Sequence, residues 1–214
     1  MQIVVDFGCE IKEYVEQQQC GQVDYPRPEA CPGCEAPRDL IGHGYYVRKT
    51  LDQEHVYRVP IKRWLCPVCR GTVSLLPSFL LRFRHYLADV IQVAVVARFE
   101  QQRSWQQMAV DCSSQGVPVL RTLQRWCRSY GEQAATWLSA LEQTLAEQAS
   151  ASSWLDAQGQ AAQAANAGQA LLQASMHLLA WAQGRWPELA GYGRDERLRF
   201  LWHWGFSRGL ERLI

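Results

Sequence analysis

Four cysteines form two pairs with the spacing of metal ligands. Cys31 and Cys34 lie in CPGC, and Cys66 and Cys69 lie in CPVC. A CxxC turn presents two thiolates to one point, and zinc binds four such sulfurs at tetrahedral corners about 2.3 Å away. The two turns therefore predict one Zn²⁺ held by all four cysteines. Four protein ligands leave no open position, so we expect the zinc to be structural and not catalytic.

The alternative interpretation is a set of buried or redox-active thiols. A thioredoxin-type CxxC stands alone ahead of a helix in a βαβ unit, and neither pair has that context. The first twenty residues carry early acids and no basic stretch, and no apolar run reaches the length of a membrane span. We therefore expect a cytoplasmic protein whose thiols stay reduced, with no membrane partner. Of the other cysteines, we expect Cys112 and Cys127 in the core, whereas Cys9 and Cys20 stay open.

Strands must bring the two turns together. GYYVRKTL and HVYRVPIKRWL, within residues 42–65, are rich in β-branched and aromatic residues, and LDQE lies between them. This pattern predicts a β-hairpin, which would place CPGC beside CPVC and complete a zinc ribbon. Metal binding would also supply folding free energy to this small, core-poor hairpin. Short elements precede it, namely a strand over 1–7 and a helical turn or two over 11–19.

After Pro77 the hydrophobic period becomes helical. Residues 83–102 predict one largely buried helix, and Ser104 with Gln107 predicts a capping box that begins a short helix over 104–112. A break at SSQGVP precedes a further helix over 118–130. The last two helices have the pattern of a helix-turn-helix, because the second helix is apolar on one side and basic on the other.

The second helix of this pair is the candidate recognition helix. Leu120, Leu123 and Cys127 have the i, i+3, i+7 spacing of one helix face, and we expect that face to point into the protein. Arginine can fork onto guanine or clamp phosphate, and glutamine can contact adenine. The alternative is an ordinary helical hairpin with a solvated basic face, and the six-residue break is longer than a standard turn. The outward residues predicted to contact nucleic acid are Val119, Arg121, Thr122, Gln124, Arg125 and Arg128.

The charge distribution favours a polyanionic partner. Residues 38–128 hold fourteen Lys and Arg against six Asp and Glu, whereas acids outnumber bases on both sides of that segment. A basic middle with acidic flanks is typical of nucleic-acid binding, although basic surface is common. On the hairpin, we predict backbone contacts to DNA from Arg48, Lys49, Arg58, Lys62 and Arg63.

The tail differs in composition, because residues 131–183 contain no Lys or Arg. Apolar stripes at 137–145 and 171–181 predict two helices, joined near Ser150–Ser153, and a last helix follows within 194–214. These Trp-rich helices predict a helical core, or else an oligomerisation or partner-binding surface. His177 and His203 lie on apolar helix faces, and we expect no catalytic role for either.

Two stretches together resemble the N-terminal region of bacterial insertion-sequence transposases. RWLCPVCRGTVSLLP (63–77), with GHGYYVRK (42–49), is similar to their zinc ribbon, and GVPVLRTLQRW (116–126) is similar to their helix-turn-helix. The order of ribbon, long helix and helix-turn-helix also matches. The resemblance covers residues 28–130 and implies the DNA-binding half of such a protein. Their catalytic domain presents three carboxylates on strands and a helix, but residues 131–214 show no strand pattern, so we expect no enzyme.

We therefore expect a mainly α protein with a small β zinc ribbon. The expected divisions are an N-terminal segment and ribbon over 1–77, a helix-turn-helix domain over 78–130, and helices for oligomerisation or partner binding over 131–214. The first hypothesis is a bacterial, nucleoid-associated protein that binds double-stranded DNA, regulates or assists a mobile element, and has a transposase or recombinase partner. The second is a protein-interaction module of a larger nucleoprotein complex, RNA-guided or recombinase, which docks through its Trp-rich helices.

Overall fold

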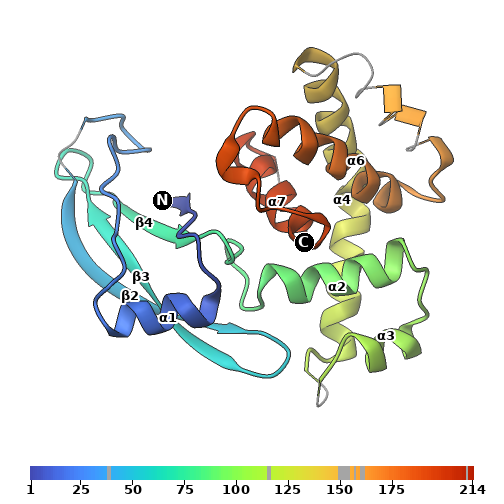
Figure 1. Cartoon of the computed structure of the whole chain (residues 1–214), viewed down its shortest axis with the longest axis horizontal. Helices are drawn as coiled ribbons and strands as arrows, with labels where there is room; N and C mark the ends of the chain where they lie inside the picture. The colour runs from blue at the N-terminus through green and yellow to red at the C-terminus, as the bar shows by residue number, and fades with distance from the viewer. Residues whose placement is uncertain (38–39, 115–116, 149–154, 157, 160–161, 211) are drawn as a thin grey trace. The chain divides into compact units, whose positions relative to one another are not determined.

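The structure of the chain is a computed structural model, which describes residues 1–37, 40–114, 117–148, 155–156, 158–159, 162–210 and 212–214. It divides into two compact units, Met1–Leu87 and Ala88–Ile214, which Figure 1 shows. The first unit combines a sheet with a short helix, and the second is helical. The division does not coincide with the predicted limits, since residues 78–87 belong to the first unit and residue 130 lies inside a helix of the second.

The first unit is built on a four-stranded mixed sheet in the order β1-β4-β3-β2. β1 (Gln2–Val5) runs parallel to β4 (Thr72–Pro77), and β4 runs antiparallel to β3 (Val56–Leu65). β3 pairs antiparallel with β2 (Ile41–Leu51) in a hairpin. This hairpin confirms the strands predicted within residues 42–65, and β1 confirms the predicted N-terminal strand.

Asp52 holds the turn of the hairpin. Its Oδ1 accepts hydrogen bonds from the backbone N–H groups of Glu54, at 2.6 Å, and His55, at 2.5 Å. Its Oδ2 accepts one from the Tyr57 hydroxyl at 2.9 Å. Aspartate often closes turns in this way, because its short carboxylate reaches the next backbone amides. The predicted turn at LDQE is thus held by the carboxylate of Asp52, which belongs to the turn itself.

Helix α1 (Ile11–Gln19) packs against β3. Tyr14 is fully buried, and its hydroxyl donates a hydrogen bond to the Pro60 carbonyl at 3.0 Å. Ile11 is buried beside it on the same helix. Ile11 and Tyr14 therefore form the buried side of this helix, and α1 confirms the helical turns predicted over 11–19.

The helices of the second unit surround α4, the long yellow helix of Figure 1. Both α2 and α3 contact α4, and α6 packs along it, while α7 contacts α6 and α2. The unit also contains two short 3₁₀ segments, η1 (Pro187–Leu189) and η2 (Arg194–Glu196). The α-helices are α2 (Ala88–Phe99), α3 (Trp105–Asp111), α4 (Leu120–Gln148), α6 (Ala167–Gln183) and α7 (Arg197–Ser207).

The helix bounds differ from the predictions in two places. The helix predicted over 83–102 begins only at Ala88, because Phe83 has φ 62°, a left-handed conformation that a helix cannot contain. The helix predicted to end at 130 continues to Gln148. Gly131 does not end it but lets α2 approach, since a Cβ there would lie 3.3 Å from Phe99 Cζ. The joint predicted near Ser150–Ser153 lies outside the described residues.

The apolar stripes of the tail are buried within the chain. Trp137, Leu141 and Leu145 of α4 are fully buried, and α6 packs along the same helix. Gly205 of α7 is so close to Trp137 that a Cβ there would lie 2.1 Å from the ring. The stripe that raised the possibility of an oligomer therefore has partners inside its own unit. Trp202 is also buried, whereas Trp186 is 43% exposed.

Candidate functional site

The N-terminal turns of α4 present the basic surface that the sequence predicted. Leu123 and Cys127 are buried, as expected for the inward side. The predicted outward residues line a surface hollow of about 670 Å³ together with Leu120. Val119, Arg121, Arg125 and Arg128 are exposed, whereas Thr122 and Gln124 are partly covered. No Asp or Glu lines this hollow, and the first acid along α4 is Glu132, one turn after Arg128.

One capping box begins α3, and a pair of backbone hydrogen bonds precedes α4. Ser104 and Gln107 form the predicted capping box, with Ser104 Oγ accepting the Gln107 N–H at 3.3 Å and Gln107 Oε1 accepting the Ser104 N–H at 2.9 Å. Between the helices, Ser114 and Val117 exchange two backbone hydrogen bonds. Residues 115–116 of the predicted break lie outside the described residues. The connection from α3 to α4 is therefore held by its own backbone.

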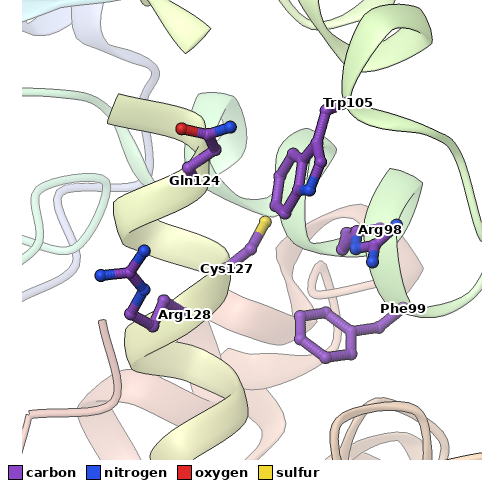
Figure 2. Close-up of a pocket in the computed structure, with 6 residues that line it drawn as sticks. All are labelled: Arg98, Phe99, Trp105, Gln124, Cys127 and Arg128. Carbon is purple, nitrogen blue, oxygen red and sulfur yellow. The ribbon is translucent and has the colours of Figure 1, made fainter. Parts of the chain in front are cut away.

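A second hollow, of about 330 Å³, lies between α2, α3 and α4. Figure 2 shows Gln124, Cys127 and Arg128 on α4 facing Arg98, Phe99 and Trp105. Burial raises the pKa of the Cys127 thiol to about 12, so this thiol is neutral and not a nucleophile. Sequence reasoning missed this hollow, because Arg98 and Trp105 come from helices whose facing sides only the tertiary structure defines.

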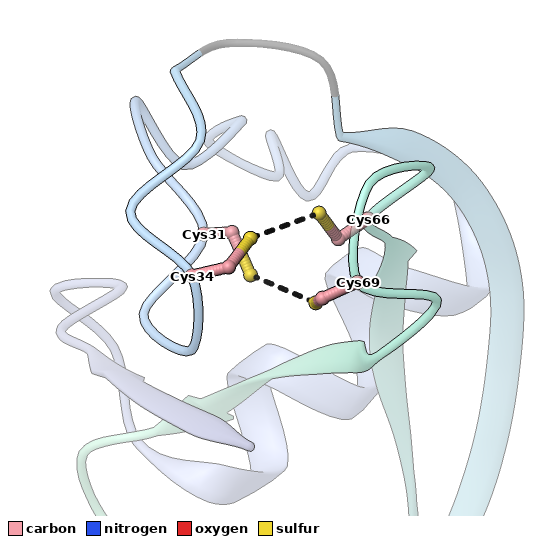
Figure 3. A group of neighbouring side chains, drawn as sticks. All are labelled: Cys31, Cys34, Cys66 and Cys69. Carbon is pink, nitrogen blue, oxygen red and sulfur yellow. Dashed lines mark hydrogen bonds between the residues drawn. The ribbon is translucent and has the colours of Figure 1, made fainter.

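The four predicted metal ligands lie together in the first unit. Their Sγ atoms all lie within 4.8 Å of one another. The Sγ atoms of Cys31 and Cys69 are 3.7 Å apart, and so are those of Cys34 and Cys66. Dashed lines mark these two contacts in Figure 3. A tetrahedron with arms of about 2.3 Å has edges of about 3.8 Å. The four sulfurs are therefore close enough together to hold one metal ion.

The two cysteine turns have the same backbone geometry. The N–H of Cys31 donates to the carbonyl of Ala36 at 3.0 Å, and the N–H of Cys66 donates to the carbonyl of Gly71 at 2.9 Å, five residues on in each case. Immediately after the second cysteine, Glu35 has φ 57° and Arg70 has φ 58°. Two segments far apart in the sequence thus fold alike, which indicates a shared structural requirement.

A small core supports the cluster. Cys31 and Cys66 are buried with Leu40 and Val73, while Cys69 is exposed. Trp64 and Ile3 pack against this group. The second cysteine of each turn lies nearer the surface, and the first cysteine of each anchors the turn in the core.

The thiols of the cluster differ in acidity before any metal binds. Hydrogen bonding from the Gly33 N–H lowers the pKa of Cys31 to about 7. A bond from the Ala36 N–H lowers the pKa of Cys34, but desolvation and the other three thiols outweigh it and raise that pKa to about 12. Thiolates that share one site repel each other. A cation that neutralises this charge would be favoured at the site.

The remaining cysteines lie outside the cluster. Cys112 and Cys127 are buried, which confirms the prediction that they belong to the core. Cys9 is partly exposed and Cys20 is exposed. Desolvation raises the pKa of Cys9, and nearby carboxylates including Glu13 raise it further. The structure therefore assigns no ligand position to either of these two.

The basic residues predicted on the hairpin have different environments. Lys49 and Arg58 are exposed and lie directly opposite each other on β2 and β3. Lys62 is half-buried, with Nζ 4.6 Å from the centre of the Tyr45 ring, and Arg63 Cζ lies 6.0 Å from the Tyr46 ring. Lys49 and Arg58 are therefore the hairpin cations that present the most surface to a partner.

Arg48 differs from its neighbours because the fold uses its guanidinium. The Nη2 atom donates to the carbonyl of Leu81 at 2.5 Å and to the carbonyl of Arg84. Desolvation lowers the pKa of this side chain, although an arginine remains charged. Sequence reasoning could not predict this role, because the loop that Arg48 binds lies more than thirty residues away along the chain.

The comparisons with known proteins give one family match. Residues 31–126 match the model of a domain of unknown function (DUF6431). The matched segment begins at the first cysteine of the cluster and ends within α4, so it contains all four cysteines and the basic surface of α4 up to Arg125 but not Arg128. No curated protein matches the chain, and neither does any solved structure.

Among the helices that the structure describes, none combines the length and the apolar character that crossing a membrane requires.

Proposed function

We propose that the chain is a zinc-containing protein that binds double-stranded DNA. In this proposal the cysteine cluster is the metal centre of a zinc ribbon, and α3 with α4 forms a helix-turn-helix. The observation that carries the proposal is the hollow on α4, where Arg121, Arg125 and Arg128 lie together without an acid. Exposed arginines on the first turns of a helix are what major-groove and phosphate contacts require.

The metal proposal rests on the donor set and the geometry. Four thiols with tetrahedral spacing favour zinc, because thiolate ligands select soft or borderline ions over magnesium or calcium. Reconstituting the full chain with Zn²⁺ should give one bound ion per chain by elemental analysis. Cys66→Ser should lower this to well below one, because the remaining site has only three thiolates.

Cys20→Ser is the matched control, because this cysteine is exposed and lies outside the cluster. It should retain a full equivalent of zinc. A Cys66→Ser protein that also retains a full equivalent with unchanged affinity would contradict the proposed ligand set.

DNA binding is tested by a salt titration with the zinc-loaded full chain. Each phosphate contact contributes a slope of about −0.9 to the logarithm of affinity against the logarithm of salt concentration. Replacing Arg121 and Arg125 with Gln should weaken binding on the order of 10-fold and make the slope less steep by about 2. Arg208→Gln is the control, since this arginine is also exposed in the second unit but lies at the end of α7.

Two results would overturn the DNA proposal. One is the absence of binding at low salt, and the other is an affinity that does not change with salt. A duplex RNA competitor belongs in the same titration. Equal displacement by RNA and DNA at matched concentration would point to shape or charge recognition, and not to a DNA-specific protein.

A role in a mobile element, as an accessory, an end- or target-recognition factor or a regulator, rests on the resemblance to insertion-sequence transposases. Selection of bound sequences from a random duplex library provides the test. Enrichment of one motif that recurs at the ends of a neighbouring element would support this role, whereas an unenriched library would leave a non-specific binder and contradict end recognition.

A further inference from the structure

We propose that the hollow between α2, α3 and α4 is a second binding site, which takes the phosphate and base of a single nucleotide. Its six lining residues are Arg98, Phe99, Trp105, Gln124, Cys127 and Arg128. Its volume of about 330 Å³ lies at the lower end of the range for pockets that bind small ligands. The site is distinct from the outer surface of α4, although Gln124 and Arg128 border both.

The charge of the lining selects an anion. Arg98 and Arg128 contribute two guanidinium groups, and no carboxylate lines the hollow. Two guanidinium groups near one space favour phosphate, because arginine donates paired, charge-assisted hydrogen bonds to it.

Two acids on the segments that flank the hollow are paired with other arginines. Glu100 lies 2.7 Å from Arg197 and 3.2 Å from Arg194, and Asp111 lies 3.8 Å from Arg103. Among the described residues, neither Arg98 nor Arg128 has an ion-pair partner within 4 Å. Glu100 and Asp111 therefore do not pair with the two arginines of the hollow, and Glu132, one turn after Arg128 on α4, is exposed and does not line it.

The aromatic side of the lining selects a planar group. Arg98 Cζ lies 4.7 Å from the centre of the Trp105 ring, so the guanidinium covers part of the indole. Figure 2 shows the Trp105 ring beside the Cys127 sulfur, with Gln124 across the hollow from it. Indole rings stack with nucleobases of any sequence. A phosphate near Arg128 and a base near Trp105 would satisfy both parts of the lining.

Arg98 is held in place for such a role. Its Nη1 donates to the carbonyl of Arg103 at 2.9 Å, and that bond crosses the connection between α2 and α3. One guanidinium is thus fixed before a ligand arrives, whereas Arg128 is exposed on α4. A fixed cation opposite a mobile one lets the site close on a phosphate at little entropic cost for Arg98.

The test is calorimetric titration of the zinc-loaded full chain, in the absence of duplex DNA, with adenosine monophosphate, ribose 5-phosphate and a short single-stranded oligonucleotide. Adenosine monophosphate should bind more tightly than ribose 5-phosphate, on the order of 10-fold, because only the former can stack. If only the oligonucleotide binds, and Trp105→Ala removes that binding, the nucleotide comes from a DNA strand and the proposal stands. Absence of binding by all three at millimolar concentration overturns it.

Variants separate this site from general charge effects. Arg128→Gln should weaken nucleotide binding on the order of 10-fold, and it should fold normally because the side chain is exposed. Trp105→Ala should abolish the preference for a base. Arg208→Gln should bind as the parent chain does. Unchanged nucleotide binding in Arg128→Gln would overturn the proposal, whatever the outcome of the duplex titration.

Discussion

Arg48 shows how a residue with the right charge for DNA can serve the fold instead. It belongs to the basic hairpin, but its guanidinium binds the carbonyls of Leu81 and Arg84. Those carbonyls lie in the segment between β4 and α2, where Leu80 and Leu81 are fully buried. The arginine therefore ties a buried connection to the edge strand β2.

This role predicts a loss of stability from Arg48→Ala. The change removes the donor to two carbonyls and should lower the free energy of unfolding of the first unit by about 1–3 kcal/mol. Lys49→Ala is the matched control, because Lys49 is the next residue on β2 and is exposed. Its effect should stay within about 0.5 kcal/mol. Chemical denaturation measures both, and equal effects would contradict the structural role of Arg48.

At the residue scale, the cysteine cluster was predictable and the pocket was not. The spacing of Cys31, Cys34, Cys66 and Cys69 is local information, and one hairpin brings the two turns together. The pocket around Trp105 depends on how three helices meet. A helical period predicts which side of a helix is apolar, but it does not predict which arginine of a neighbouring helix will lie beside that side.

At the scale of elements, sequence patterns predicted the strands well but misplaced two helix limits. The strands of 42–65 are rich in β-branched and aromatic residues, and that pattern is largely local. The helix end predicted at residue 130 was wrong, because α4 continues through Gly131 to Gln148. The physical role of Gly131 is contact with Phe99 of α2, and a glycine needed for close approach cannot be distinguished from a helix terminator by sequence alone.

The second unit also depends on one buried ionic group that joins its elements. Glu100 follows α2 and contacts both Arg194 of η2 and Arg197 of α7, of which Arg197 is only 2% exposed. Beside it, Gln92 Nε2 donates to the carbonyl of Arg194 at 3.0 Å, and Gln92 Oε1 accepts the N–H of Leu198 at 2.8 Å. These bonds fix the start of α7 on α2.

Glu100→Gln should therefore destabilise the second unit. The variant leaves the buried Arg197 charge without its counterion, which costs about 3 kcal/mol near neutral pH. Although desolvation acts to raise the pKa of Glu100, the hydrogen bonds and charges of Arg197 and Arg194 outweigh it and lower that pKa below its ordinary 4.5. A lowered carboxyl pKa means that the stabilisation is complete above the unfolded pKa and is lost as pH falls through the folded one.

The pH profile distinguishes this ion pair from a packing defect. The difference in unfolding free energy between the parent and Glu100→Gln should shrink as the pH falls below about 4.5, because the parent also loses the charge. Glu132→Gln, at an exposed position of α4, should show no such difference. A difference for Glu100→Gln that stays constant with pH would mean that the carboxylate charge is not the cause.

At the scale of the whole molecule, the two units rely on different sources of stability. The first has a small core around the cysteine cluster and further buried residues such as Tyr14, Ile61 and Leu75 on its sheet, whereas the second buries Trp126, Trp137 and Trp202 among its helices. Small domains with little core gain much of their folding free energy from a structural metal. The second unit contains no part of the cluster and has a large apolar core of its own.

Metal removal should therefore act on one unit only. A strong chelator should unfold the cysteine turns of Met1–Leu87 and the small core around them, because four unpaired thiols cannot replace the free energy of zinc binding. The helical circular dichroism signal should stay nearly constant, since most helical residues belong to Ala88–Ile214. Limited proteolysis measures the loss of structure in the first unit. Cleavage should appear within residues 1–87 after chelation and disappear when Zn²⁺ is restored.

Cooperative loss of the helical signal on chelation would instead show that the fold of the second unit depends on the metal.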